Sequence, residues 1–151
     1  MIKLSDYVIR YLEQLNVAHM FMIPGGGAMH LNDSLGNSKH IQYVVCLHEQ
    51  ACAIAAEAYA RVSNKTGLLM VTTGPGGTNA LTGVTAAYIE STPMIVISGQ
   101  VKTADMINGQ GIRQQGMQEV DIVSIVKPFT KYAKLILDPD SIKYHLDRAV
   151  Y

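Results

Sequence analysis

The chain has 151 residues, 48% of them hydrophobic, so it is long enough to fold as one domain with a sizeable core. Lysine plus arginine equal aspartate plus glutamate at 12 each, which gives no electrostatic basis for binding nucleic acid or an anionic membrane. No apolar run approaches the roughly 18 residues of a membrane span, and no signal segment is present. Cys46 and Cys52 form no CxxC pair and are interpreted as reduced core thiols. We expect a soluble, cytoplasmic protein with no metal site in this chain.

Helical and strand patterns alternate along the chain. Ser5 is expected to cap an amphipathic first helix, and the first apolar run stops at Pro24-Gly25-Gly26-Gly27, which the interior of a strand or helix would not tolerate. Asn64 is expected to end the helix that begins near Glu49, and Asp121 to cap a short helix that Pro128 breaks. The predicted helices cover residues 5–16, 29–35, 49–64, 80–90, 121–126 and 139–151. The predicted strands cover residues 18–23, 41–47, 67–72, 94–98 and 129–137.

These short apolar strands, separated by helices, predict an α/β fold. The expected architecture is a mostly parallel sheet with helices on both faces. We expect residues 1–151 to form a single domain. The last predicted helix is still apolar at Tyr151 and has no capping glycine. We therefore expect the chain to be the N-terminal part of a longer, multidomain protein.

Residues 99–120 interrupt the alternation of strands and helices. This stretch is rich in Gln and Gly and poor in apolar side chains. Long connections without regular structure are uncommon in compact domains and are usually functional or mobile. We expect it to be the least ordered part of the chain.

Glu49 lies where the second predicted strand meets an alanine-rich helix. A carboxylate in the first helical turn is favoured by the helix dipole, which is the simplest, purely structural interpretation. However, open α/β sheets bind their ligands at the carboxyl ends of their strands, and Glu49 follows such an end. The small residues of the helix would also form a flat, close-packing face suited to a symmetric dimer. Glu49 is therefore a candidate site residue.

Two glycine-rich turns follow strands, at residues 24–27 and 73–79. Backbone amides at a helix start can hold a phosphate, but residues 74–79 have Asn79 where a dinucleotide fingerprint has its third glycine. No Gly-Lys-Ser/Thr sequence completes a P-loop. The five histidines are scattered, so neither a nucleophile with a base nor a metal site can be argued.

Taken together, five sequence motifs resemble a known domain. The chain is similar throughout to the N-terminal pyrimidine-binding domain of thiamine diphosphate enzymes of the acetolactate (acetohydroxyacid) synthase family. The motifs are Ile23-Pro24-Gly25-Gly26-Gly27-Ala28, His48-Glu49-Gln50 with the helix that follows to Arg61, Thr73-Gly74-Pro75-Gly76-Gly77-Thr78-Asn79, Ser98-Gly99-Gln100-Val101 and Met117-Gln118-Glu119.

The resemblance implies roles for individual residues. Glu49 matches the glutamate that hydrogen-bonds N1′ of the cofactor's aminopyrimidine, where burial favours its proton and lets the two groups share it. Gln118 matches a residue that projects toward the active site. Gly26 is placed with these two as catalytic, in the loop near the reacting carbon. The cofactor-binding positions implied are Pro24, Gly25, Gly26, Glu49, Thr72, Pro75 and Asn79.

The chain departs from the family pattern at three positions. Ile23 replaces a frequent aromatic residue, Gly27 an alanine and Met117 a phenylalanine. These differences concern the acceptor substrate more than the cofactor.

The resemblance also implies a missing half. The diphosphate-binding domain of the same or a partner chain would hold the Mg²⁺, and FAD is conceivable in a full-length enzyme. A homodimer or tetramer through this domain, a 2-keto acid substrate and a place in branched-chain amino acid biosynthesis are expected. The chain alone should be inactive.

Three functions remain open from the sequence. We favour decarboxylation of a 2-keto acid followed by carboligation. A close alternative is another thiamine diphosphate-dependent decarboxylase or lyase, or a nucleotide-sugar acetyl transferase. A separately encoded, non-catalytic subunit or regulatory binding module belongs to a different class.

Overall fold

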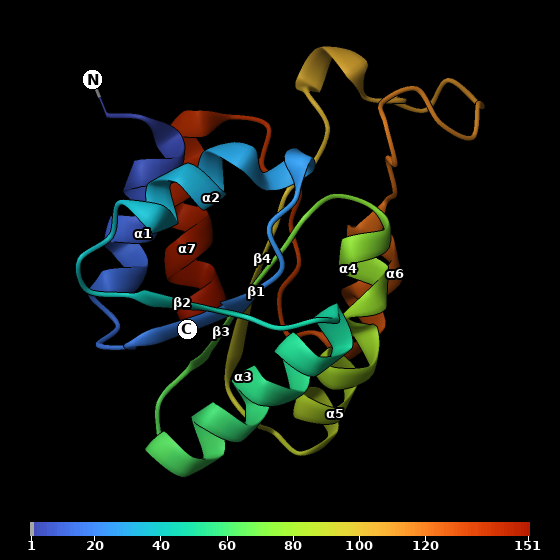
Figure 1. Ribbon diagram of the computed structural model, residues 1–151. Coiled ribbons are helices and arrows are strands. Elements are labelled where there is room, and N and C mark those ends of the chain that lie inside the picture. Colours follow the sequence, from blue (N-terminus) through green and yellow to red (C-terminus); the bar gives the residue numbers. More distant parts are fainter. Residues whose placement is uncertain (1) are drawn as a thin grey trace.

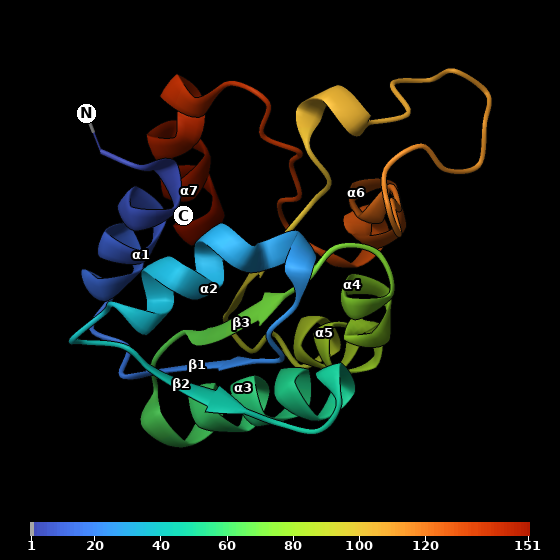
Figure 2. The ribbon, with the colours of Figure 1, turned by 45° about the horizontal axis from the view of Figure 1, so that its top comes forward.

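The computed structural model describes residues 2–151 and contains one sheet in the strand order β2-β1-β3-β4, with neighbouring strands parallel (Figures 1 and 2). The strands are β1 (His19–Met22), β2 (Gln42–Val45), β3 (Gly67–Val71) and β4 (Met94–Ser98). The helices are α1 (Leu4–Glu13), α2 (Met29–Gly36), α3 (Glu49–Ser63), α4 (Pro75–Asn79), α5 (Leu81–Ile89), α6 (Ile122–Val126) and α7 (Ile142–Val150). Short 3-10 turns lie at Gly26–Ala28, Thr103–Asp105, Lys127–Phe129 and Pro139–Ser141.

The sheet separates two apolar layers, as the alternation of side chains in its central strands requires. Met20, Leu68 and Met70 face the layer that contains α1, α2 and α7, whereas Leu69 and Val71 face α3 and α5. Figure 2 shows these two groups of helices on opposite faces of the sheet. All five residues of β3 are buried, as expected for a central parallel strand. The predicted α/β fold is confirmed.

Small residues let α3 lie very close to both α5 and the sheet. A β-carbon built on Gly83 of α5 would lie 2.5 Å from the β-carbon of Ala53, and one built on Gly67 would lie 2.4 Å from the carbonyl oxygen of Ala56. Cys52, Ala53, Ala56 and Ala60 are buried by this packing. The small residues that suggested a dimer face are thus largely used inside the chain.

Local signals at helix ends were only partly correct. Asn64 ends α3 in the left-handed conformation with φ 55°, and the Asp121 carboxylate accepts a hydrogen bond from the Ser124 amide at 3.1 Å, both as predicted. Ser5 is not the cap of α1, because the helix begins at Leu4 after Lys3. Ser5 is instead buried and accepts a hydrogen bond from the Ser34 hydroxyl at 2.8 Å, which joins α1 to α2.

The predicted strand over residues 129–137 is wrong. Only Lys127–Phe129 is regular, as a 3-10 turn that continues α6 past Pro128, and the rest of this stretch pairs with no strand. Tyr132 of this stretch contacts α7 instead. Its hydroxyl lies 2.5 Å from Nδ1 of His145, and Arg148 lies 6.0 Å from the centre of its ring. These contacts with α7 hold the segment away from β4.

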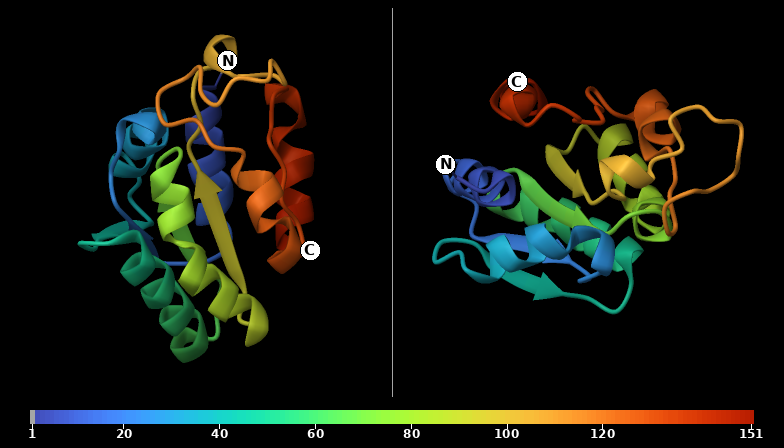
Figure 3. Two further views of the ribbon diagram at one scale, coloured as in Figure 1. Left: turned by 90° about the vertical axis from the view of Figure 1, so that its right-hand side faces the viewer. Right: turned by 90° about the horizontal axis from the view of Figure 1, so that it is seen from above.

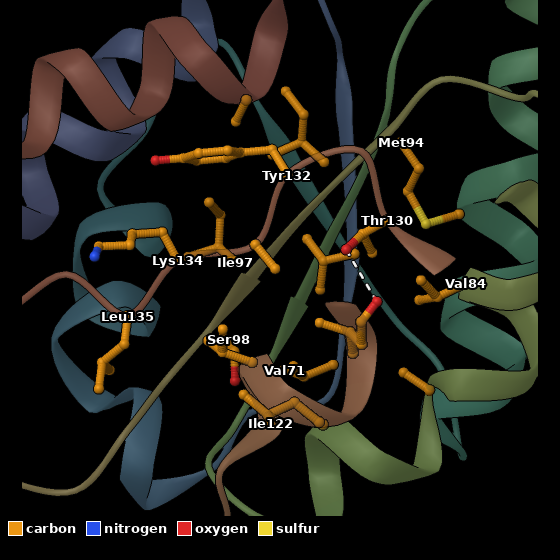
Figure 4. A pocket seen from close by; sticks show the side chains of 18 of the residues that line it. Val71, Val84, Met94, Ile97, Ser98, Ile122, Thr130, Tyr132, Lys134 and Leu135 are labelled. Atoms are coloured by element: carbon orange, nitrogen blue, oxygen red, sulfur yellow. Dashed lines mark hydrogen bonds between the residues drawn. The ribbon is translucent and has the colours of Figure 1, made fainter. Parts of the chain in front are cut away.

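A cavity of about 1220 Å³ lies beside β4 as a result (Figure 4). It is bounded by β4, α5, α6, the segment 130–136 and the end of α7, and Figure 4 shows Ile97, Tyr132 and Leu135 around it. Glu49 does not line it. The cavity is therefore a feature of the β4 edge and does not include the Glu49 junction.

Residues 99–120 form the longest irregular connection in the described chain, and their middle part projects from the body (Figures 1 and 3). The residues on both sides of this projecting part are anchored by hydrogen bonds. The Glu119 carboxylate accepts hydrogen bonds from the amides of Ile107 at 2.9 Å and Gly116 at 3.3 Å, and Met106 is buried. The prediction that this segment is the least ordered remains a prediction.

Candidate functional site

The turns that follow β1, β2 and β3 meet at one end of the sheet. Because the strands are parallel, their carboxyl ends lie at the same edge, and the chain must turn there into the next helix. The segment after β1 begins at Ile23, β2 leads through Cys46 to Glu49, and the segment after β3 begins at Thr72. This brings three of the motifs singled out in the sequence to one place.

The side chain of Thr72 packs between the turn after β1 and the turn after β3. A β-carbon built on Gly25 would lie 2.5 Å from Cβ of Thr72, and one built on Gly76 would lie 2.7 Å from Cγ2 of the same side chain. A β-carbon on Gly76 would also lie 3.5 Å from Oε1 of Glu49. The glycines therefore do not provide flexibility here; they provide room for the half-buried Thr72 and for Glu49.

Glu49 is the first residue of α3 and is half-buried. The Asn79 amide nitrogen, at the end of α4, lies 2.6 Å from its Oε2 and 3.2 Å from Nε2 of His48. No ion pair between residues 2 and 151 includes Glu49. The carboxyl group is thus held by one amide side chain at the positive end of a 15-residue helix.

Gln118 reaches this region by its backbone. Gly74 has φ 65° and ψ −120°, which L-residues rarely adopt, and a β-carbon built on it would lie 1.9 Å from the carbonyl oxygen of Gln118. Gln118 itself has φ 58° and an exposed side chain. The structure therefore places the backbone of Gln118 against the turn after β3, and the role expected for its side chain stays a prediction.

The remaining predicted site residues lie on the surface of the same edge. Pro24, Gly26, Pro75 and Asn79 are exposed, and a β-carbon on Gly26 would meet no atom within 4 Å. Gly25 is fixed from behind by Asn32 of α2, whose Nδ2 donates to the Gly25 carbonyl at 3.1 Å. The predicted residues form one continuous patch, open to solvent on the side of Gly26.

Sequence reasoning assigned no role to His48, although it belongs to the quoted motif. His48 precedes α3, and its Nδ1 accepts a hydrogen bond from the Gln50 amide at 3.3 Å, so it caps the helix that carries Glu49. Histidine is not among the residues usually preferred at this position, so no propensity signal predicts it. Gln100 was likewise missed: its side-chain oxygen accepts from the Thr73 hydroxyl at 2.7 Å and ties β4 to the turn after β3.

Both cysteines lie near Glu49, in the apolar layer under α3. Cys52 is fully buried and Cys46 is partly exposed, and both are free thiols. Burial, with the neighbouring Cys46 as a second cause, raises the pKa of the Cys52 thiol to about 12. Cys52 is therefore a packing residue at neutral pH and not a nucleophile.

Residues 2–151 contain neither a cluster of metal-ligating side chains nor a membrane-spanning helix. No group of three or more His, Cys, Asp or Glu side chains in this range is arranged to hold a metal ion. None of the helices in the described chain has the length and apolar character required to cross a membrane.

Comparison with known proteins connects this geometry to a family. Residues 2–125 match the family described as "Thiamine pyrophosphate enzyme, N-terminal TPP binding domain". The chain is 38% identical over 147 residues to the acetolactate synthase large subunit of Lactococcus lactis, and 39% identical over 148 residues to the acetolactate synthase of Mycobacterium bovis. It is 35% identical over 147 residues to the acetolactate synthase isozyme 3 large subunit of Escherichia coli.

Each of these alignments covers 97% of this chain but only 23 to 25% of the relative. The chain thus spans about a quarter of the length of the curated relatives it matches, and the range that matches the family model contains all the turns that build the Glu49 patch. The chain belongs to the family of N-terminal thiamine pyrophosphate (thiamine diphosphate) binding domains, and within it resembles those of acetolactate synthase large subunits.

Proposed function

We propose that this chain is the pyrimidine-binding domain of an acetolactate synthase-type enzyme, which decarboxylates a 2-keto acid and joins the product to a second carbonyl compound. The observation that supports this most is the position of Glu49: a half-buried carboxyl at the start of α3, beside Asn79 and the glycine turns. The name of the relatives supports the substrate class, and the diphosphate-binding half is assigned to sequence outside this chain.

The residues present fit one part of the cofactor. A flat aromatic ring needs a surface without projecting side chains, and Gly26, where a β-carbon would meet no atom within 4 Å, leaves such a surface open beside Gly25. The ring nitrogen needs a partner that can hold or release a proton, which Glu49 provides. We assign Pro24, Gly25, Gly26, Thr72, Pro75 and Asn79 to the surface that contacts the cofactor, and Gln118 with Gly26 to the substrate side.

Glu49 would position a proton at N1′ of the aminopyrimidine. A carboxyl group at hydrogen-bond distance from a ring nitrogen can share a proton with it, and partial burial strengthens that hydrogen bond. Thiamine diphosphate, when bound, supplies the electron sink for decarboxylation. The amide of Asn79 would orient the Glu49 carboxyl, and the Gln118 side chain would contact the substrate.

The diphosphate of the cofactor would be bound outside this chain. We assign its Mg²⁺, and FAD where the enzyme carries it, to the remaining regions of the longer protein. The isolated chain is then inactive and binds thiamine diphosphate weakly, because it holds only one end of the molecule. Isothermal calorimetry checks this: dissociation constants in the micromolar range for the isolated chain would contradict it.

The experiment for the catalytic role is Glu49→Gln in the enzyme assembled with its diphosphate-binding half. We expect exchange of the C2 proton of bound cofactor, measured by NMR after acid quench, to fall by about 10² to 10⁴, because a positioned acid or base is lost. Glu90→Gln is the control, since Glu90 is exposed directly after α5 and forms an ion pair with Arg61. Near-normal exchange in Glu49→Gln would refute the assignment.

We also propose that the domain forms a homodimer through the outer side of α3. Although most small residues of α3 are buried, an apolar stripe remains exposed, with Ile54 46% and Val62 90% accessible and Ala58 between them. These residues are four apart and lie on one side of the helix. Contact with the same stripe of a second copy, in a symmetric dimer, is the commonest way to bury such a surface.

Sedimentation velocity tests the dimer. Val62→Lys should shift the chain toward monomer, because it places a charge on the stripe. Leu137→Lys is the control, since Leu137 is also an exposed apolar residue, 56% accessible, but belongs to the connection between α6 and α7 and not to α3. Equal sedimentation of the two variants and the parent chain would exclude α3 as the interface.

A further inference from the structure

A polar atom near the start of α2 is buried without a hydrogen-bond partner. Within residues 2–151 nothing donates to the side-chain oxygen Oδ1 of Asn32. The Nδ2 atom of the same side chain donates to the Gly25 carbonyl at 3.1 Å. A buried acceptor left unpaired costs at least as much free energy as one neutral hydrogen bond contributes. Stability alone therefore does not explain an asparagine at this position, and the contact with Gly25 calls for another reason.

The contact of Asn32 fixes the orientation of one peptide group. The Gly25 carbonyl accepts a second hydrogen bond, from the Ala28 amide at 3.0 Å, so two donors hold it toward α2. The peptide bond that follows is trans, and in a trans peptide the C=O and N–H groups point in opposite directions. The Gly26 N–H therefore points away from α2. None of the backbone hydrogen bonds found within residues 2–151 uses it.

The free amide lies at the candidate site. The 3-10 turn Gly26–Ala28 continues directly into α2, and Figure 2 shows the start of this helical run beside the turn from β3 to α4. A β-carbon built on Gly27 would lie 2.5 Å from Cγ2 of Thr73 in that turn. Gly26 itself is exposed, and a β-carbon on it would meet no atom within 4 Å. The Gly26 N–H is thus on the open side of the Glu49 patch.

The chemistry of the substrate side requires such a donor. None of the residues assigned to the cofactor or the substrate is a lysine or an arginine. The carboxylate of a 2-keto acid has to be bound by N–H groups there, and an amide at the start of a helical run is well suited to an anion.

We propose that Asn32 is a positioning residue that, by holding the Gly25 carbonyl, directs the Gly26 N–H to the carboxylate of the 2-keto acid. The recognition of a 2-keto acid rests on the proposed function, whereas the role of Asn32 in orienting the peptide does not. Because the donor is oriented before the substrate arrives, little reorganisation is required on binding.

The orientation of the peptide can be tested in the chain itself by NMR. Asn32→Leu removes the donor and the unpaired oxygen while keeping a side chain of similar size. We expect the carbon-13 shift of the Gly25 carbonyl and the nitrogen-15 shift of the Gly26 amide to change. Asn37→Leu is the matched control, because Nδ2 of Asn37 also donates to a backbone carbonyl, that of Asp33 at 2.9 Å, but at the other end of α2. Unchanged shifts in Asn32→Leu would overturn the proposal.

Steady-state kinetics of the assembled enzyme tests the binding of the substrate. Asn32→Leu should raise KM for the 2-keto acid about fivefold, as expected when one hydrogen bond to the carboxylate is weakened. Its kcat and its affinity for thiamine diphosphate should stay within about twofold, because the bond exists before the reaction begins. Asn32→Gln keeps an N–H donor on a side chain one methylene longer and should recover part of the loss. Asn37→Leu should leave KM unchanged.

Two outcomes would contradict the role of Asn32. One is an unchanged KM in Asn32→Leu, with folding verified by circular dichroism. The other is an equal loss of substrate and cofactor affinity in both Asn32 variants, which would indicate a general disturbance of the site.

Exchange of the C2 proton, measured without substrate, separates this proposal from the proposed function. It should be near normal in Asn32→Leu and strongly reduced in Glu49→Gln. Near-normal exchange in Glu49→Gln would refute the proposed function, whereas a normal KM in Asn32→Leu would refute only the role of Asn32.

Discussion

The α3–α5 face of the sheet and the edge at β4 differ in how closely their segments approach. On the first, Gly83 and Gly67 bring helix and strand backbones against α3, and no β-carbon would fit at either glycine without displacing its neighbours. At β4, residues 130–136 are held by side chains to α7, and a cavity of about 1220 Å³ remains. The comparison indicates that α3, which carries Glu49, is fixed by backbone packing, whereas the segment beside β4 is held through side chains.

The largest expected effect is at the helix contact. Gly83→Ala should lower the free energy of unfolding by about 2 to 3 kcal/mol, because its β-carbon would lie 2.5 Å from that of Ala53 and 2.9 Å from the Ile54 amide nitrogen. Urea unfolding measures this. Gly36→Ala is the matched control: it is also helical, its β-carbon would meet nothing within 4 Å, and it should be neutral or stabilising by up to about 1 kcal/mol. Equal effects of the two changes would contradict close packing as the cause.

Gly74 forms the contact between the turn after β3 and the segment that contains Gln118. Gly74→Ala should cost about 1 to 2 kcal/mol, since its positive φ is unfavourable for alanine and its β-carbon would lie 1.9 Å from the Gln118 carbonyl oxygen. Gly111→Ala shares a positive φ, 74°, but projects into open space. We expect amide chemical shifts around Gln118 to change only in Gly74→Ala. Similar shifts in both variants would show that the contact with Gln118 is unimportant.

A smaller effect is expected from the anchor of the 99–120 segment. Glu119→Gln should reduce stability by about 1 kcal/mol, because a neutral amide replaces a carboxylate that accepts from the Ile107 and Gly116 amides. Hydrogen exchange should accelerate at these two amides and leave β4 unchanged. The parent chain supplies a second comparison: if amides 103–116 are protected as strongly as those of β4, the segment is prefolded and our expectation of low order fails.

The smallest effect concerns the buried thiol. Because the pKa of Cys52 is raised to about 12 in the folded chain, the native state keeps its proton while the unfolded thiol, with a pKa near 9, loses it. This stabilising difference is complete below about pH 9 and is lost progressively as the pH rises toward about 12. Between about pH 8 and pH 10, the parent chain should lose up to about 1 kcal/mol more stability than Cys52→Ala. Parallel pH profiles for the two proteins would contradict the shift.

Features determined by neighbouring residues were predictable from the sequence. Asn64 and Asp121 act at helix ends through their own turn, and the order of apolar runs and glycine turns predicted a parallel α/β sheet with the site at its carboxyl edge. The prediction that Ser5 caps α1 was wrong because its hydroxyl is hydrogen-bonded to Ser34, 29 residues away, and not to its own helix. The strand expected over 129–137 fails for a similar reason, since Tyr132 contacts α7.

The candidate site could be proposed from the sequence as a set of residues, but the contacts among them could not be predicted. Glu49 and Asn79 were singled out separately, and their 2.6 Å contact depends on how α3 and α4 are placed by the sheet. His48 could not be identified, because its effect requires both the start of α3 and the end of α4. The hydrogen bonds of the candidate site therefore depend on contacts between elements that are distant in sequence, which the sequence pattern does not show.

The central claim is that the Glu49 patch is the binding surface for the cofactor's aminopyrimidine. A crystal structure of the assembled enzyme with thiamine diphosphate tests it most directly. The account predicts a Glu49 carboxyl oxygen within about 2.6 to 3.2 Å of N1′, with the ring beside Gly25, Thr72 and Gly76. A ring bound in the cavity beside β4, or one whose N1′ is hydrogen-bonded to another residue, would contradict the account.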